Sequence, residues 1–267
     1  MTPFKSTAQF YSRFRVPYPM SLIGQLERDA SLQSSSVVLD LATGPGRIAL
    51  RLAPCVRKVV AIDNESEMLD EGAAQARRLG VENVEWIKAK AEEVVVDPGS
   101  IDLVTVGEAI HRLEQDLVLS RIRRWLRNSA CVAIVGCFGV LHGGDPWQES
   151  LRRALEKWTV SRSQGKPKRW RGEDYDIARL VEAGFHGVVN RTFSVSHKWT
   201  RESILGNLHS TSRFSLSALG DDLEDFDIQV MRTLQEYETD EFFQTIPCGY
   251  AIGWKGKRST SRNIAIH

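Results

Sequence analysis

The sequence predicts an α/β fold built around a doubly wound, mostly parallel β-sheet. Short apolar runs without polar alternation are separated by segments whose apolar residues recur at helical spacing. Strands of that kind have both faces covered, as in parallel sheets with helices on each side. A glycine-rich turn at residues 42–46 also follows the first apolar run directly. The chain of 267 residues is long enough for one such domain with an insertion.

Seven segments have the pattern of strands, and among the first five, helical patterns follow the first, second and fourth, whereas a turn at residues 97–100 precedes the fourth. The predicted strands span residues 36–41, 59–63, 84–87, 101–106, 130–135, 187–196 and 248–254. Helical spacing predicts a helix from Ser21 onward and helices at 47–53, 65–79, 117–126, 147–160, 177–183, 200–208 and 221–238. Pro3, Pro17 and Pro19 limit regular structure in the first 20 residues. We therefore expect an irregular arm ahead of the sheet.

Bulk composition argues against several classes of protein. The formal net charge is +1, so no overall field favours nucleic acid or a membrane surface. No run of about 18 apolar residues predicts a transmembrane helix, and the first 14 residues lack the apolar core of a secretory signal. The four cysteines include no C-x-x-C pair that would suggest zinc or a redox dithiol. We expect a reduced, cytoplasmic protein with no metal site and no disulfides.

The turn at 42–46 has the composition of a ligand-binding loop. In a doubly wound sheet, ligands bind outside the carboxyl ends of the strands, and this turn lies at the first such end. Gly44 and Gly46 permit positive φ and a close backbone approach, and the amides of the following helix start can hold an anionic group. The alternative is a plain turn between strand and helix. The residues at the next strand ends favour a nucleotide-type cofactor.

Asp63 closes the second strand, about 20 residues after the glycine-rich turn, the usual spacing for an acid that binds ribose hydroxyls. Its alternative role is an N-cap for the next helix. Residues 89–92 follow the third strand, and residues 107–111 follow the fourth. Four consecutive strand ends with small or polar residues favour a cofactor site over packing alone.

Taken together, these motifs resemble the class I S-adenosylmethionine-dependent methyltransferases. The four motifs of that family correspond to residues 39–46, 60–63, 89–92 and 101–111, the last in the form that ends in a histidine. Residues 11–19 are similar to the opening of the subgroup that includes trans-aconitate-type and other small-molecule methyltransferases. The resemblance covers residues 10–140 well and 175–254 weakly. It implies a Rossmann-like seven-stranded sheet with a helical insertion or lid, and S-adenosyl-L-methionine as the cofactor.

The resemblance also implies site residues. Those expected to bind the cofactor are Tyr11, Arg15, Asp40, Ala42, Gly44, Gly46, Asp63, Asn64, Met68, Ala91, Glu92 and Glu108. Tyr11 and Arg15 would close over the site, with Arg15 available to a carboxylate. His111 would lie near the sulfonium and the acceptor, either as a general base or as a residue that shapes the pocket. Ala42 departs from the family pattern by replacing the first glycine, and Lys90 stands where an acid often contacts the adenine amine.

We expect five regions along the chain. They are an N-terminal arm and helix that close the site (1–30), a cofactor-binding core (31–137), an insertion or lid with a helix (138–185), a segment that completes the sheet and carries a helical cap (186–254), and a disordered tail (255–267). The insertion and the helices at 200–238 would form the acceptor pocket.

Several alternatives stay open. A dinucleotide enzyme of the same fold should have a G-x-G-x-x-G/A loop, and the spacing of Ala42, Gly44 and Gly46 does not exclude that register. The histidine motif and the N-terminal stretch favour the sulfonium cofactor. A small-molecule acceptor is the preferred reading. The basic stretch 166–171, which contains a tryptophan, is the support for an RNA or protein acceptor, although nucleic acid is not expected. The fold could also bind the cofactor without transferring a methyl group.

Overall fold

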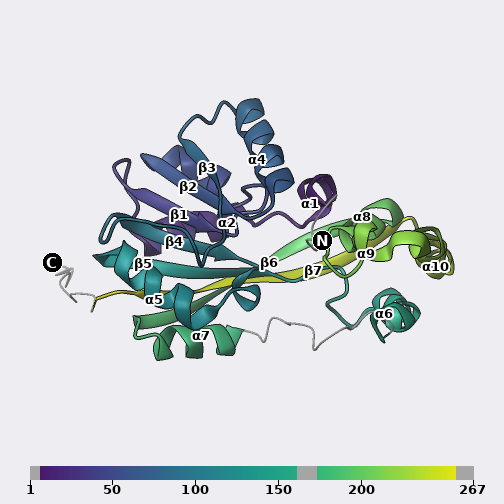
Figure 1. The fold of residues 1–267 in the computed structure, drawn as a ribbon. Helices are drawn as coiled ribbons and strands as arrows, with labels where there is room; N and C mark the ends of the chain where they lie inside the picture. Colours follow the sequence, from purple (N-terminus) through teal and green to yellow (C-terminus); the bar gives the residue numbers. More distant parts are fainter. Residues whose placement is uncertain (1–6, 161–172, 257–267) are drawn as a thin grey trace.

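The computed structural model describes residues 7–160 and 173–256. Its strands form one seven-stranded sheet in the order β3-β2-β1-β4-β5-β7-β6, with helices on both faces (Figure 1). The strands are β1 (Val37–Leu41), β2 (Lys58–Asp63), β3 (Val84–Lys88), β4 (Ile101–Gly107), β5 (Leu126–Cys137), β6 (His186–Thr200) and β7 (Glu241–Trp254). The predicted fold class is confirmed.

Strand pairing fixes where a ligand can bind. β1 pairs in parallel with β2 on one side and with β4 on the other, so the strand order reverses between β1 and β4. β3 and β5 extend the parallel sheet, and β7 runs antiparallel to both β5 and β6. At such a reversal the connecting loops diverge, which leaves a crevice outside the carboxyl ends of the strands.

Two layers of helices cover the sheet. The helices are α1 (Ala8–Phe14), α2 (Met20–Asp29), α3 (Ala49–Leu52), α4 (Ser66–Leu79), α5 (Gln115–Trp125), α6 (Pro146–Val160), α7 (Glu173–Glu182), α8 (Arg201–His209), α9 (Leu216–Leu219) and α10 (Leu223–Gln235), with 3₁₀ turns η1 (Ala53–Cys55), η2 (Ile110–Arg112) and η3 (Gly220–Asp222). Successive strand residues face opposite layers. Val38 packs in the core that contains α2 and α3, whereas Leu39 packs in the core that contains α5 and α7.

The last two strands are longer than the sequence predicts. β6 and β7 pair from His186 opposite Trp254 to Thr200 opposite Glu241, and they extend beyond the other strands to a helical cap of α6, α8, α9 and α10 (Figure 1). Along residues 241–246 buried and exposed residues alternate. A half-buried antiparallel pair has that alternation, so wholly apolar runs mark only the buried end of β7.

The N-terminal segment is helical, which the sequence analysis did not predict. Pro17 and Pro19 follow α1, so they limit the helix without preventing it. α1 packs on α8, where Gly206 leaves room for the ring of Phe14. The Asn207 side-chain amide donates a hydrogen bond of 2.9 Å to the Phe14 carbonyl. The arm is thus attached to the cap.

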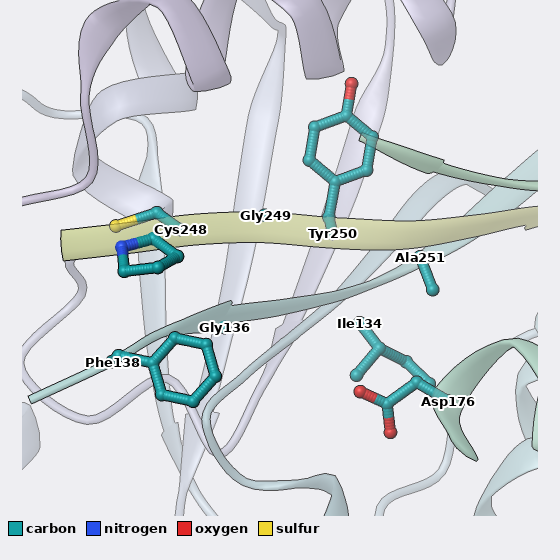
Figure 2. Close-up of a pocket in the computed structure, with 9 residues that line it drawn as sticks. Ile134, Gly136, Phe138, Asp176, Cys248, Gly249, Tyr250 and Ala251 are labelled. Atoms are coloured by element: carbon teal, nitrogen blue, oxygen red, sulfur yellow. The ribbon is translucent and has the colours of Figure 1, made fainter. Parts of the chain in front are cut away.

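The expectation of no disulfides is wrong for one pair. Cys137 and Cys248 lie directly opposite each other on β5 and β7, and a disulfide joins them with their Cα atoms 4.1 Å apart. Their sequence separation is 111 residues, so only the antiparallel pairing brings them together. Figure 2 shows this part of β7, where Tyr250 and Ala251 point to opposite sides of the strand.

Alanine substitutions at two helical glycines test the packing of α1 on α8. A Cβ at Gly206 would lie 2.2 Å from the Phe14 ring, whereas a Cβ at Gly24 of α2 would have its nearest neighbour, the Arg28 guanidinium, at 3.5 Å. Gly24→Ala should raise the free energy of unfolding by up to about 1 kcal/mol through helix propensity. Gly206→Ala should lower it by about 1–3 kcal/mol, because Phe14 must move. Urea denaturation measures both; equal stabilisation by the two changes would contradict this packing.

Candidate cofactor site

A cavity of about 450 Å³ lies outside the carboxyl ends of β1 to β4. Its walls are formed by Tyr11, Ala42, Gly44, Asp63, Asn64, Glu65, Met68, Ala89, Lys90, Ala91, Glu92, Glu93, Gly107, Glu108, Ala109, Arg112, Leu113 and Glu114. The structure thus brings most of the predicted cofactor residues to one cavity, although they come from five segments of the chain. The predicted residues outside its lining are Arg15, Asp40, Gly46 and His111.

The glycine-rich turn adopts left-handed backbone geometry three times. Ala42, Gly44 and Gly46 have φ of 51°, 56° and 78°. The left-handed conformation costs a residue with a Cβ about 1–2 kcal/mol, so Ala42 is strained where a glycine would not be. Gly46 is needed for packing, because a Cβ there would lie 2.5 Å from the Trp86 ring. Trp86 therefore supports the turn from β3.

Asp63 joins the glycine-rich turn to the start of α4. One carboxylate oxygen accepts a hydrogen bond of 2.8 Å from the Gly44 amide, and the other accepts one of 2.9 Å from the Glu65 amide. Burial raises the pKa of the Asp63 carboxyl above its ordinary value, and these backbone hydrogen bonds act against the shift. Asp63 is not the N-cap of α4, because that position is Glu65, but its carboxylate binds the backbone just ahead of the helix and also lines the cavity.

Asp40 lies beneath the turn and not in the cavity wall. It is fully buried, and its carboxylate accepts hydrogen bonds from the hydroxyls of Thr43 in the turn and Thr105 on β4, the second at 2.6 Å. Burial raises the pKa of Asp40 to about 6, although the two hydroxyls lower it. This acid therefore fixes the turn against the neighbouring strand.

Glu108 is the centre of a buried ion-pair cluster at the end of β4. Arg15 donates to its Oε2 at 2.9 Å, while Tyr18 and Arg47 donate to its Oε1 at 3.3 and 3.4 Å. Arg15 lies over the Tyr11 ring with its guanidinium carbon 4.8 Å from the centroid, and Arg47 lies over the Tyr18 ring at 4.4 Å. The cluster joins the N-terminal arm, the loop after β1 and the end of β4.

The charges in this cluster shift the pKa values of Tyr18 and Arg47. Burial and the Glu108 carboxylate raise the pKa of Tyr18 well above its ordinary value, so the phenol stays protonated. Burial alone would lower the pKa of Arg47, but Tyr18 and Glu108 raise it above the ordinary value. Arg47 also donates to the Val16 carbonyl. The sequence analysis assigned no role to Tyr18 or Arg47, although both lie in segments it singled out.

The structure places Arg112, and not His111, in the cavity wall. Both belong to η2, and His111 is half-buried, whereas Arg112 is exposed. The Arg112 guanidinium donates to the Ser212 hydroxyl at 2.9 Å, which connects η2 to the cap. The position of a strand end in the sequence predicts which segment reaches the cavity. It does not predict which side chain of a tight turn faces the cavity.

Acidic side chains dominate the wall. Six carboxylates line the cavity, namely Asp63, Glu65, Glu92, Glu93, Glu108 and Glu114, against the two cations Lys90 and Arg112. Lys90 is paired with Glu93 at 2.8 Å. Low-dielectric walls focus such a field, so the cavity favours a ligand with positive charge.

The other wall residues missed by the sequence analysis are neighbours of predicted ones. They are Glu65, Glu93, Arg112, Leu113 and Glu114. Each lies within three residues of a predicted residue or segment, so widening the predicted segments would have included them. Ala89, Lys90, Gly107 and Ala109 also line the cavity, and they lie inside the segments 89–92 and 107–111 that the sequence predicts at the site.

The expected lid does not line this cavity within the described residues. α6 packs instead against α10, with Trp158 edge-on to Phe226 at 5.4 Å, and Trp147 lies against Phe242 of β7. The basic stretch 166–171 and most of the tail 255–267 lie outside the described residues. The cap reaches the site indirectly, through the bonds from Arg15 to the Ser210 carbonyl and from Arg112 to Ser212.

Comparison with known proteins identifies the core. Residues 38–129 match a protein-family profile described as a methyltransferase domain. The matched segment contains β1 from its second residue, β2 to β4, the glycine-rich turn, and all of the cavity wall except Tyr11. Residues 38–129 are thus similar to a methyltransferase domain, and the match spans less than half of the chain.

Similar proteins share this domain and its fold. The uncharacterized methyltransferase YcgJ of Bacillus subtilis is 29% identical over 131 residues, which is 49% of each chain. An uncharacterized methyltransferase of Schizosaccharomyces pombe is 26% identical over 155 residues, 58% of this chain and 59% of that protein. The alignments therefore span only half to three-fifths of these relatives.

Solved structures extend the likeness of fold beyond the methyltransferase domain. The crystal structure of YcgJ superposes with a TM-score of 0.57 at 16% identity, covering 90% of this chain and 100% of that one. A phosphoethanolamine N-methyltransferase of Haemonchus contortus, solved with phosphomonomethylethanolamine and S-adenosylhomocysteine, has a TM-score of 0.55 at 18% identity and covers 94% of this chain and 57% of that one.

Two kinds of feature are absent from the part of the chain that the structure describes. Residues 7–160 and 173–256 contain no cluster of three or more histidine, cysteine or acidic side chains arranged to hold a metal ion. No helix in the same ranges is both long and apolar enough to cross a membrane.

The buried carboxyl beneath the turn should make stability depend on pH. The pKa of Asp40 is about 6 in the fold, against 3.8 ordinarily. The folded state therefore holds a proton that the unfolded state has lost, so this group's contribution to the free energy of unfolding falls as pH rises from about 4 to 6. Asp40→Asn should remove that fall, as measured by denaturant titrations across this range. Asp70→Asn, at an exposed acid on α4, should keep the wild-type profile. An unchanged profile in Asp40→Asn would contradict the assignment.

Proposed function

We propose that this protein is a methyltransferase that uses S-adenosyl-L-methionine and acts on a small-molecule acceptor. The observation that carries the proposal is the acid-rich cavity that a methyltransferase domain builds where the strand order reverses. Its volume of about 450 Å³ suits a small-molecule site. The wall is formed by backbone turns and polar side chains at four strand ends, which is how this kind of sheet holds nucleotides.

The charge of the wall favours this cofactor over a dinucleotide. S-adenosylmethionine carries a sulfonium and an ammonium against one carboxylate, so its net charge is positive. A dinucleotide carries a pyrophosphate, and the wall, in which carboxylates outnumber cations, would repel it. Ala42 stands where a dinucleotide-binding loop has its first glycine. Its backbone is left-handed, and its methyl group takes up space in the turn that a glycine would leave open.

We assign the ends of the cavity from the placement of its residues. Asp63 and the neighbouring Asn64 would bind the ribose, while Met68 and Ala91 would border the adenine. The turn residues Ala42 and Gly44 would face the methionine end. Asp63 keeps acceptor capacity for ribose hydroxyls, because each of its oxygens accepts one backbone hydrogen bond and has a second lone pair.

Catalysis by these residues is mainly a matter of position. When bound, S-adenosylmethionine supplies a methyl group that its sulfonium has already activated. The protein then needs to hold donor and acceptor in line, and proximity of this kind supplies about 7–11 kcal/mol. His111, on the turn that follows β4, remains our candidate for a base or a pocket-shaping residue. A base is required only where the acceptor atom is a poor nucleophile, and it adds about 10²–10⁴-fold.

The acceptor class is a further part of the proposal. The phosphoethanolamine N-methyltransferase of Haemonchus contortus was solved with phosphomonomethylethanolamine, a small phosphorylated amine, which supports a small acceptor without identifying ours. The alternative of an RNA or protein acceptor depends on the stretch 166–171, outside the described residues. Conversion of S-adenosylmethionine to S-adenosylhomocysteine in the presence of a metabolite pool would distinguish a transferase from a protein that only binds the cofactor.

Asp63 provides the direct test of the cofactor assignment. Asp63→Asn should weaken S-adenosylmethionine binding by about 1.5–3 kcal/mol, or about 10- to 150-fold, because a charged hydrogen-bond acceptor is lost. Titration calorimetry measures the affinity, and the thermal midpoint shows whether the turn is still folded.

The matched control is Asp70→Asn, which makes the same change on the exposed side of α4 and should bind like the wild type. Wild-type affinity in Asp63→Asn, or tighter binding of NAD(P) than of S-adenosylmethionine by the wild type, would contradict the proposal.

A further inference from the structure

A histidine in the cap has a hydrogen bond at each of its ring nitrogens. His209 is the last residue of α8, and only 3% of it is exposed. Its Nδ1 lies 2.8 Å from the Phe214 carbonyl oxygen, and its Nε2 lies 2.9 Å from Oδ1 of Asp227 on α10. The rings of Phe10 on α1 and Phe226 on α10 cover it, with centroids 5.4 and 5.6 Å from that of the imidazole. The imidazole therefore joins α8 to α1, to α10 and to the loop that follows α8.

The chemistry of these two partners requires a proton on both nitrogens. A carbonyl oxygen and an ionised carboxylate accept hydrogen bonds and cannot donate them. A neutral imidazole has one N–H, so it forms only one of the two bonds, and its other nitrogen then faces an acceptor with a lone pair. Both bonds form together only when His209 is an imidazolium paired with Asp227. The dipole of α8 also favours a cation at this end of the helix.

The elements packed against α8 are α1, α10 and β6. Several of the charged side chains on these elements and on α8 form ion pairs of their own, namely Arg13 with Glu202, Arg201 with Asp240, Lys198 with Glu241 and Arg191 with Asp29. The other titratable side chains there are Tyr11 on α1, His186 and His197 on β6, Arg213 in the loop after α8, and Glu224, Asp225 and Arg232 on α10. Within the described residues, Asp227 is the ion-pair partner of His209.

The segment that His209 holds also attaches the N-terminal arm. The carbonyl of Ser210, the next residue, accepts a hydrogen bond of 3.3 Å from Arg15, which attaches the arm to the end of β4. Phe10, whose ring covers the imidazole, directly precedes Tyr11, which lines the cavity. His209 thus reaches the cavity wall by two routes through the arm.

We propose that His209 is a positioning residue: as an imidazolium bound to Asp227, it holds the N-terminal arm against the cavity, and cofactor affinity falls when it loses its proton. This inference rests on the proposed function, because its readout is cofactor binding. Loss of the proton would break the bond to Asp227 or the bond to the Phe214 carbonyl, and the segment that holds Arg15 would loosen. Histidine changes its charge between about pH 5 and 8, so cofactor binding should respond to pH in that range.

The test measures the affinity of the full-length protein for S-adenosylhomocysteine by calorimetry from about pH 6 to about pH 8.5. The wild type should bind about 2- to 30-fold more weakly at the upper end, the range for a residue that acts on a site through its neighbours. Asp227→Asn should remove this dependence and keep the tight binding. Its amide can donate to Nε2, so a neutral imidazole then forms both hydrogen bonds.

A matched control and a second measurement make the result specific. Asp225→Asn makes the same change at an exposed acid on the same helix, so it should keep the wild-type pH profile. It also retains the contribution of other titrating groups, such as Asp40, whose pKa is about 6. Nitrogen-15 NMR of the wild type at the lower end of the pH range should show that both His209 nitrogens carry hydrogen.

Three results would overturn the inference alone. They are a wild-type affinity that does not change with pH, a pH profile of Asp227→Asn equal to that of the wild type, and a single imidazole N–H at His209 in the wild type. Weaker binding by Asp227→Asn at every pH, with an unchanged thermal midpoint, would also contradict it, because a neutral imidazole should satisfy that variant. A wild type that binds neither S-adenosylmethionine nor S-adenosylhomocysteine at any pH would instead overturn the proposed function, and the inference with it.

Discussion

The Glu108 carboxylate is the interaction on which the site depends. It lies at the end of β4 with a positive φ of 53°, an uncommon conformation for a residue with a side chain. Arg15 brings the arm to it, Arg47 brings the loop after β1, and Tyr18 adds the segment before α2. A buried carboxylate left without these donors would be costly, so the arm and the strand ends stabilise each other. Tyr11 lines the cavity because the N-terminal arm is attached to Glu108 in this way.

The same cluster organises the charge of the cavity. Arg15 and Arg47 both bind the Glu108 carboxylate, whereas Glu92, Glu93 and Glu114 line the region after β3. The charge of the wall therefore differs between these two regions. An electrostatic arrangement of this kind governs the orientation and specificity of a ligand more than its affinity. The cap of α8 to α10 contributes through Ser210 and Ser212, which hold Arg15 and Arg112 from the far side.

The sequence was sufficient for the parallel sheet and for the segments that meet at the cavity. Both follow from local patterns: apolar runs mark buried strands, and residues just after them share one edge. The sequence was insufficient for features that depend on contacts between distant parts of the chain. The Cys137–Cys248 disulfide needs β5 and β7 side by side, and α1 is fixed by its contact with Gly206. Arg112, and not His111, lines the cavity because of the direction of one 3₁₀ turn, η2. Asp40, predicted to surround the methionine, lies beneath the turn because Thr105 holds it there.

The most direct test is a double-mutant cycle between Arg15 and Glu108, read by the affinity for S-adenosylmethionine. If Glu108 acts by holding the arm, Arg15→Ala and Glu108→Ala remove the same attachment. The double variant should then bind no more weakly than the weaker single variant, a strongly non-additive result for two residues 2.9 Å apart. Additive losses would mean that each side chain contacts the cofactor independently, and they would contradict the account.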